Sequence, residues 1–197
     1  MKKWILCIAT ILTLCSSVAR ADALKDGAEA QYKGNYAQAL ELLRPIAEEG
    51  NAEAQVALGL MYAKGQGVAR NYQEVLKWFR LAAAQGNVEA QFRLGAMYAR
   101  GKGVIQDYQE AVKWFQILAA QGNAQGQYKL GLMYRSGQGV ARDNVHAHMW
   151  FMLAEHQGVR AAKKKRVKIA QVMTPSQIID AQRMARDCVE KHYQNCE

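Results

Sequence analysis

The stretch LGLMYAKGQGV, residues 58–68, occurs three times in this chain. It returns as LGAMYARGKGV at 94–104 and as LGLMYRSGQGV at 130–140, so the copies are 36 residues apart. An aromatic pair follows each copy at the same interval: Trp78-Phe79, Trp114-Phe115 and Trp150-Phe151. A fixed period of this length is typical of a solenoid, in which each repeat packs only against its neighbours. The pattern therefore indicates an architecture and a class of activity, but not a partner.

Because 50% of the residues are hydrophobic and only 2 of 197 are proline, the chain can form a core. Alanine, leucine and glutamine are frequent and there are few β-branched runs, which favours an all-α chain. We expect each repeat to be an antiparallel helix pair, and the whole chain to form an α-solenoid. The second helices should begin at Asn71, Asp107 and Asp143, which are good helix caps. The predicted divisions are a signal segment at 1–21, an N-terminal capping hairpin at 22–51, repeats at 52–87, 88–123 and 124–159, and C-terminal capping helices at 160–197.

The first glycine of the motif lies in the middle of the first helix, at Gly59, Gly95 and Gly131. Glycine destabilises a helix interior by about 1 kcal/mol relative to alanine. We expect the missing side chain to let the two helices of a pair approach closely. The motif is then a device for packing and turning, and not a glycine-rich phosphate loop.

The first 21 residues are typical of a cleaved secretory signal. Lys2 and Lys3 precede an apolar run from Trp4 to Val18, and the small-x-small pattern at 19–21 predicts cleavage before Asp22. The run is shorter than the roughly 20 residues that a membrane-spanning helix needs. The protein is therefore expected in the periplasm or the medium, with no transmembrane span.

Positive charge is concentrated near the C-terminus. The formal net charge is +9, and residues 22–123 hold 11 basic and 11 acidic side chains, whereas 124–197 hold 12 and 6. Five of the cations are clustered, and they are Lys163, Lys164, Lys165, Arg166 and Lys168. This run is either a solvated face or a contact for an anionic surface such as lipid or cell-wall polymer. Export argues against nucleic acid as the partner.

Two cysteines, Cys188 and Cys196, remain after the signal segment. In an exported protein such a pair favours a disulfide. A continuous helix would separate the two residues by about 12 Å, which is too far for a bond. The chain must therefore turn between them if they are bonded, near Asn195. Two free thiols are the alternative.

The repeat resembles the Sel-one-like repeat family, a branch of the tetratricopeptide-like superfamily. The matching pattern is Leu-Gly-x-Met-Tyr-x-x-Gly-x-Gly-Val, then an aromatic residue, a tryptophan and Ala-Ala-x-x-Gly, over residues 52–159. The segment from Met173 resembles the closing helix of bacterial members, whereas 22–51 lacks the double glycine. The resemblance implies right-handed stacking of the helix pairs and a role as an adaptor for other proteins. It implies no catalytic mechanism.

If the geometry of that superfamily applies, the first helices line a concave surface that binds a protein or peptide. The matching positions are Val56, Leu60, Lys64, Phe92, Ala96, Arg100, Tyr128, Leu132 and Arg135. Such a surface suits a peptide with hydrophobic anchors and some negative charge. The alternative is that Val56, Phe92 and Tyr128 only pack against the neighbouring first helix.

No combination of residues indicates catalysis, a cofactor or a metal. His146 and His148 are two residues apart and lie on different helix faces, and His156 is a further eight residues away. The hypothesis is a non-catalytic adaptor in the bacterial cell envelope. One alternative is a β-lactam-binding or cell-wall-active protein, although the cysteine pair within every repeat that marks such relatives is missing. The other alternative is a secreted host-interaction factor.

Overall fold

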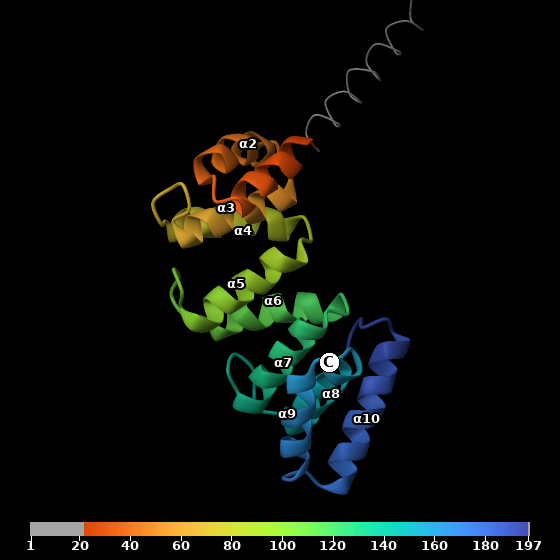
Figure 1. Ribbon diagram of the computed structural model, residues 1–197. Helices are drawn as coiled ribbons and strands as arrows, with labels where there is room; N and C mark the ends of the chain where they lie inside the picture. Colours follow the sequence, from red (N-terminus) through yellow and green to blue (C-terminus); the bar gives the residue numbers. More distant parts are fainter. Residues whose placement is uncertain (1–21, 197) are drawn as a thin grey trace, which may run out of the picture. The chain divides into compact units, whose positions relative to one another are not determined.

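The computed structural model describes residues 22–196, and the expected signal segment at 1–21 lies outside the described residues. The described part consists of α-helices joined by turns and contains no strand. A helix over 22–32 precedes the helices labelled in Figure 1. The labelled helices are α2 (Tyr36–Glu48), α3 (Ala52–Lys64), α4 (Tyr72–Ala84), α5 (Val88–Arg100), α6 (Tyr108–Ala120), α7 (Ala124–Ser136), α8 (Asn144–His156), α9 (Arg160–Ala170) and α10 (Pro175–Glu190).

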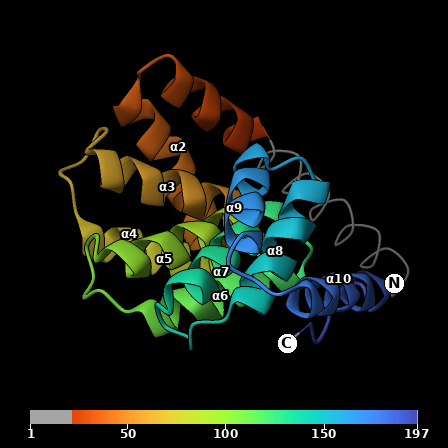
Figure 2. The same ribbon diagram turned by 90° about the horizontal axis from the view of Figure 1, so that it is seen from below.

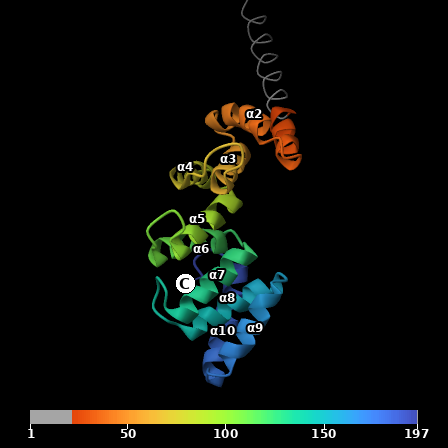
Figure 3. The same ribbon diagram turned by 60° about the vertical axis from the view of Figure 1, so that its left-hand side comes forward.

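The chain divides into two compact units, the first ending at Ala90 and the second beginning at Gln91. In the first unit, α3 packs against both α2 and α4 (Figure 3). Its core includes Leu43 from α2, Leu58 and Met61 from α3, and Phe79 from α4, all of them buried. This unit is therefore a stack of helices in which each layer covers the apolar face of the one before.

In the second unit, α7 packs against α6 and α8, and α8 in turn packs against α9 and α10 (Figures 1 and 2). One core cluster joins α6, α7, α8 and α10 around Phe115, Leu130 and Trp150. A second cluster joins α8 to α9 through Phe151 and Ile169. The predicted all-α solenoid of antiparallel helix pairs is confirmed by this arrangement.

The mid-helix glycines lie directly against an aromatic ring of the second helix of the same pair, as close packing of the two helices requires. A Cβ built on Gly95 would lie 2.7 Å from the nearest ring atom of Phe115, and one built on Gly131 would lie 2.8 Å from the ring of Phe151. Real Cβ atoms essentially never approach another heavy atom so closely. The aromatic ring of the second helix therefore occupies the volume that an alanine methyl would need.

The predicted caps of the second helices are also confirmed. The Asn71 side chain accepts hydrogen bonds from the backbone N–H groups of Gln73 and Glu74. Asp107 caps α6 in the same way, at 3.0 Å from the backbone nitrogen of Glu110, and Asp143 caps α8. Each cap satisfies donors that have no partner within the helix, so these residues fix where the helix begins.

Helix α9 begins one full period after α7, at Arg160 and Ala124 respectively (160 − 124 = 36). It also buries the same face: Ala162 and Ile169 are buried, as are Gly126 and Met133 at the matching positions of α7. Helix α9 is therefore in register with the first helices of the repeats. The sequence motif does not extend to it, because Arg166 and Val167 stand where a repeat has leucine and glycine.

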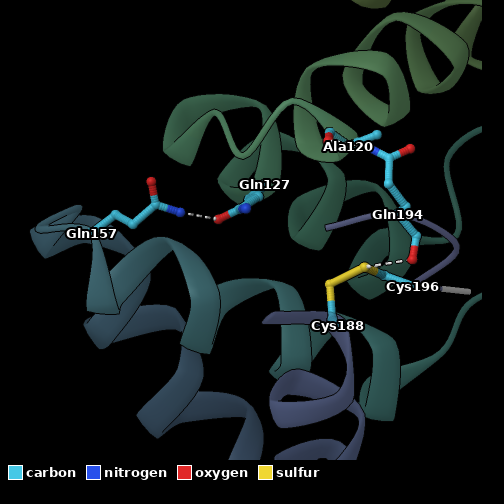
Figure 4. The surroundings of a disulfide bond; sticks show 6 residues. All are labelled: Ala120, Gln127, Gln157, Cys188, Gln194 and Cys196. Carbon is cyan, nitrogen blue, oxygen red and sulfur yellow. Dashed lines mark hydrogen bonds between the residues drawn. A yellow bond between two sulfur atoms is a disulfide. The ribbon is translucent and has the colours of Figure 1, made fainter. Parts of the chain in front are cut away.

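The chain turns back after α10, as a bond between the two cysteines requires. Cys188 and Cys196 are joined by a disulfide, with their Cα atoms 4.9 Å apart (Figure 4). His192, Tyr193 and Asn195 have φ between 51° and 64°, the left-handed region that reverses the chain. The Gln194 side chain then donates a 2.8 Å hydrogen bond to the carbonyl oxygen of Ala120. The disulfide therefore closes the C-terminal loop onto α10, and the Gln194 hydrogen bond joins this loop to the end of α6.

Candidate functional site

The predicted surface residues of the first unit differ in exposure. Val56 is only 9% exposed and belongs to the core, which is the packing role that the alternative interpretation gave it. Leu60 is half-buried and Lys64 is exposed at the end of α3. Of the three predicted residues of this unit, Leu60 and Lys64 therefore present a side chain to a partner and Val56 does not.

In the second unit, the predicted aromatic residues both pack and remain partly accessible. The rings of Phe92 and Phe115 have centroids 6.1 Å apart, and those of Tyr128 and Phe151 are 5.9 Å apart. Phe92 and Tyr128 are nevertheless half-buried, not buried. Both rings are fixed by the core on one side and accessible to a ligand on the other. The remaining predicted residues are half-buried Ala96, Leu132 and Arg135 and exposed Arg100.

Lys129, which the sequence analysis did not single out, lies between these aromatic rings. Its Nζ is 6.0 Å from the ring centroid of Phe92 on α5 and 5.9 Å from that of Tyr128 on α7. Both distances are within the range of cation–π attraction. We name the group Phe92, Arg100, Tyr128 and Lys129 the α5–α7 surface. The structure brings the predicted aromatic residues together around a cation.

The charge of Lys129 is not neutralised within the described residues, where it forms no ion pair. Burial lowers the pKa of Lys129 below its ordinary value, and the positive charge of Arg100 lowers it further. A half-buried ammonium group next to a second cation is a favourable place for an anion to bind. The sequence does contain a signal for Lys129 that was overlooked. Arg93 and Lys129 are 36 residues apart, so a cation occupies the same position in two successive repeats.

Buried glutamines, also missed by the sequence analysis, hold each repeat together. Gln55 is 2% exposed and Gln127 is fully buried. The side chain of Gln85 donates to the Oε1 of Gln55 at 2.9 Å, and Gln157 donates to Gln127 at the same distance (Figure 4). Each bond joins the start of the first helix to the end of the second. These glutamines have a structural role, and they are recognisable by their recurrence at one position of the period.

The two histidines of α8 lie in different environments, as their spacing predicted. The His146 ring lies 2.8 Å from a carboxylate oxygen of Asp143 and stacks on Tyr134. His148 is fully buried, and neither ring nitrogen has a hydrogen-bond partner. Across residues 22–196, no three His, Cys, Asp or Glu side chains are grouped to hold a metal ion. None of the helices described is long and apolar enough to cross a membrane.

The basic run lies on α9. Arg166 bonds to Glu155 of α8, with 2.6 Å between Nε and Oε2. Lys163, Lys164 and Lys168 are exposed, and Lys165 is half-buried. In the part of the chain that the structure describes, these four lysines form no ion pair. The run is therefore divided into one residue that fixes α9 to α8 and four cations that are available to an anionic partner.

A comparison with protein-family models identifies the family. The Sel1 repeat model matches residues 20–51, 52–87, 88–123 and 124–159, most of the chain. The protein belongs to the Sel1 repeat family. The match has the same three repeat boundaries as the 36-residue period, and it includes the N-terminal hairpin, which lacks the double glycine. Sel1 repeat proteins are generally adaptors for protein–protein interaction and typically are not enzymes.

Solved structures of other Sel1 repeat proteins are similar to this chain. A Sel1 repeat protein from Oxalobacter formigenes is 39% identical, with a TM-score of 0.61 over 66% of this chain and 97% of that one. The protective antigen c5321 of uropathogenic Escherichia coli is 29% identical, with a TM-score of 0.60 over 90% of this chain but 47% of its own. Cysteine rich protein B of Helicobacter pylori is 22% identical with a TM-score of 0.50 over 72% and 95% of the chains, and supports the fold alone. No curated protein matches the sequence.

Proposed function

We propose that this Sel1 repeat protein is a non-catalytic adaptor that binds a segment of another protein on the α5–α7 surface. The observation that carries the proposal is Lys129, half-buried between the rings of Phe92 and Tyr128 without a carboxylate partner in the described chain. The segment that fits this surface has an apolar or aromatic anchor next to a carboxylate. Arg100, whose charge acts on Lys129, adds positive charge beside it, and Arg135 is a further cation near the end of α7.

The energetics favour a ligand that supplies the missing counter-ion. A partly desolvated charge destabilises a protein unless it is paired. Lys129 has already lost part of its hydration on folding, so a carboxylate that approaches it has less water to displace. The two rings offer apolar area beside the charge. An acidic segment with one aromatic or aliphatic side chain can use both features at once.

The proposal includes a location in the cell envelope, where the partner would also be found. The residues at 1–21 have the pattern of a secretory signal. The disulfide between Cys188 and Cys196 supports the same compartment, because such bonds persist in oxidising environments. The likeness to a protective antigen favours a second candidate, contact with a host from the outer surface or the medium. Cell fractionation separates the two locations.

The test uses a panel of labelled peptides that vary in charge and in apolar residues. The mature chain from Asp22 is compared with Lys129→Met, which keeps an unbranched side chain only one atom shorter and removes its charge. Lys113→Met is the matched control, because Lys113 is an exposed lysine of α6 that pairs with Glu110. We expect about a tenfold loss of affinity for acidic–apolar peptides in Lys129→Met only. Equal affinity of both variants, with unchanged circular dichroism, would contradict the proposal.

A further inference from the structure

Three first helices of the second unit carry a cation at one position of the 36-residue period. The residues are Arg93 on α5, Lys129 on α7 and Lys165 on α9, and all three are half-buried. The matching position of the first repeat is Ala57, so the cations are confined to the second unit. Neither Lys129 nor Lys165 forms an ion pair with any residue between 22 and 196. We name Arg93, Lys129 and Lys165 the cation ladder.

The register of α9 makes the ladder a feature of one surface. Helices α7 and α9 both pack on α8, and they bury matching positions: Gly126 and Met133 in α7, and Ala162 and Ile169 in α9. The positions between these buried ones must then face the same way in both helices. Tyr128 and Leu132 of α7 pack against the cluster that α8 forms with Ala162 and Ile169 of α9, so α7 and α9 both contribute side chains to one core around α8.

The surface changes in character from α5 to α9. The position occupied by Phe92 in α5 and Tyr128 in α7 is taken by Lys164 in α9, and the position of Leu132 is taken by Lys168. One end of the surface therefore offers aromatic rings and the other end offers uncompensated lysines. A ligand that crosses the three helices meets apolar side chains first and cations last.

We propose that the partner segment crosses α5, α7 and α9 in a polyproline II conformation and places acidic side chains three residues apart on Lys129 and Lys165. Polyproline II has three residues per turn and advances about 3.1 Å per residue. Side chains three residues apart therefore point the same way and start about 9 Å from each other. The flexible stems of Lys129 and Lys165 can approach both of them. The apolar anchor precedes or follows this acidic pair at the Phe92 end.

This inference rests on the proposed function, because it specifies the ligand of the same surface. A soluble acidic segment is favoured over an anionic membrane, since Lys165 and Lys129 are half-buried and the apolar contacts of the surface are rings fixed by the core. A lipid headgroup layer would instead use the most exposed cations, Lys163 and Lys164. The two kinds of partner therefore depend on different lysines of α9.

The experiment compares two fluorescent peptides of identical composition, each with one leucine anchor and two glutamates. The glutamates are three residues apart in one peptide and adjacent in the other. We expect the mature protein to bind the spaced peptide about tenfold more tightly, because only that peptide reaches both lysines. Lys165→Met should abolish this preference, whereas Lys163→Met, the same change on an exposed lysine of α9, should retain it.

Each other outcome identifies what has failed. If Lys163→Met and Lys165→Met weaken binding equally, or if heparin and phosphatidylglycerol vesicles compete with both peptides alike, α9 is a general polyanion site and the ladder is wrong. If both peptides bind equally and Lys129→Met weakens both, the α5–α7 surface binds an acidic segment but the spacing rule fails. If neither peptide binds to the folded protein, the proposed function fails as well.

Discussion

Two junctions of the second unit have the same geometry but opposite chemistry. At the first, α6 meets α7 through Val112, Ala119 and Leu130, all buried and apolar. At the second, α8 meets α9, and the positions 36 residues later are His148, Glu155 and Arg166. Three apolar residues are thus replaced by a buried imidazole and an ion pair. The difference occurs where the last repeat meets the C-terminal helices. We call the contact of α6 with α7 the apolar junction and the contact of α8 with α9 the polar junction.

The comparison indicates how the end of the array is specified. An apolar junction accepts any helix with a complementary apolar face, so it cannot distinguish one repeat from the next. At the polar junction, by contrast, Glu155 and Arg166 each require the other residue, because either charge alone would be partly buried without compensation. We therefore infer that the polar residues restrict α9 to the end of the stack, where another repeat would otherwise pack. The three predictions below test this difference.

The largest effect is expected from the disulfide, which closes the C-terminal loop onto α10. Replacement of Cys188 and Cys196 by alanine should lower the free energy of unfolding by about 2–3 kcal/mol, since a short covalent loop is lost. In hydrogen exchange, α9 and α10 should lose protection while α6 and α7 keep it. Mass spectrometry without reductant should first show the two-hydrogen deficit of the bond.

A reductant added to the wild-type protein is the control, because it opens the same loop without a change of sequence. It should lower the midpoint of thermal unfolding as the double replacement does. An unchanged midpoint, or a loss of protection spread evenly over both junctions, would show that the loop does not support the polar junction.

The second effect is expected from the ion pair of the polar junction. Glu155→Ala should cost about 1–2 kcal/mol, because Arg166 is 27% exposed and loses its carboxylate. Combining Glu155→Ala with Arg166→Leu restores the residue types of the apolar junction. That double variant should be as stable as the wild type or more so, since a partly buried pair replaced by packed apolar groups is often neutral.

Denaturant unfolding of the two single variants and the double variant completes a thermodynamic cycle. The free energy of unfolding that the double variant loses should be much smaller than the sum of the two single losses, because the two side chains bond to each other. If the double variant loses the sum of the two single losses, the two side chains are independent and the junction is not specified by their bond.

The sequence predicted the helix pairs well because their signals are local and repeated. Glycine in the middle of a helix and an asparagine or aspartate before the next one recur in all three repeats, as at Gly131 and Asp143. Helix α9 was missed as a continuation of the period for the opposite reason. Its two diagnostic residues, leucine and glycine, are replaced by Arg166 and Val167, and only the burial of Ala162 and Ile169 reveals the register.

The candidate site was predicted in part. Phe92 and Tyr128 were recognised because the resemblance to the tetratricopeptide-like superfamily implies that their positions line the concave surface. Lys129 was not, because a lysine next to an aromatic residue is common on any helix surface. What distinguishes it is the distance to the Phe92 ring on another helix, which only the structure supplies. Likewise, the bond between Glu155 and Arg166 depends on the position of α9 and has no sequence pattern of its own.

The smallest effect is a pH dependence from His148, the third polar residue of the α8–α9 junction. Burial lowers the pKa of His148 in the folded state, Arg166 lowers it further by charge repulsion, and Glu155 opposes the shift. The unfolded chain therefore takes up a proton below about pH 6.5 that the folded protein resists, and stability falls as the pH decreases. The slope cannot exceed about 1.4 kcal/mol per pH unit for one proton.

The test is urea unfolding between pH 7.5 and 5 of the variant His148→Leu, which places at 148 the residue that the first repeat has at Leu76. The free energy of unfolding of this variant should lose the slope. The control variant His156→Ala, which changes an exposed histidine, should retain it. Equal slopes in both variants would assign the pH dependence to other groups.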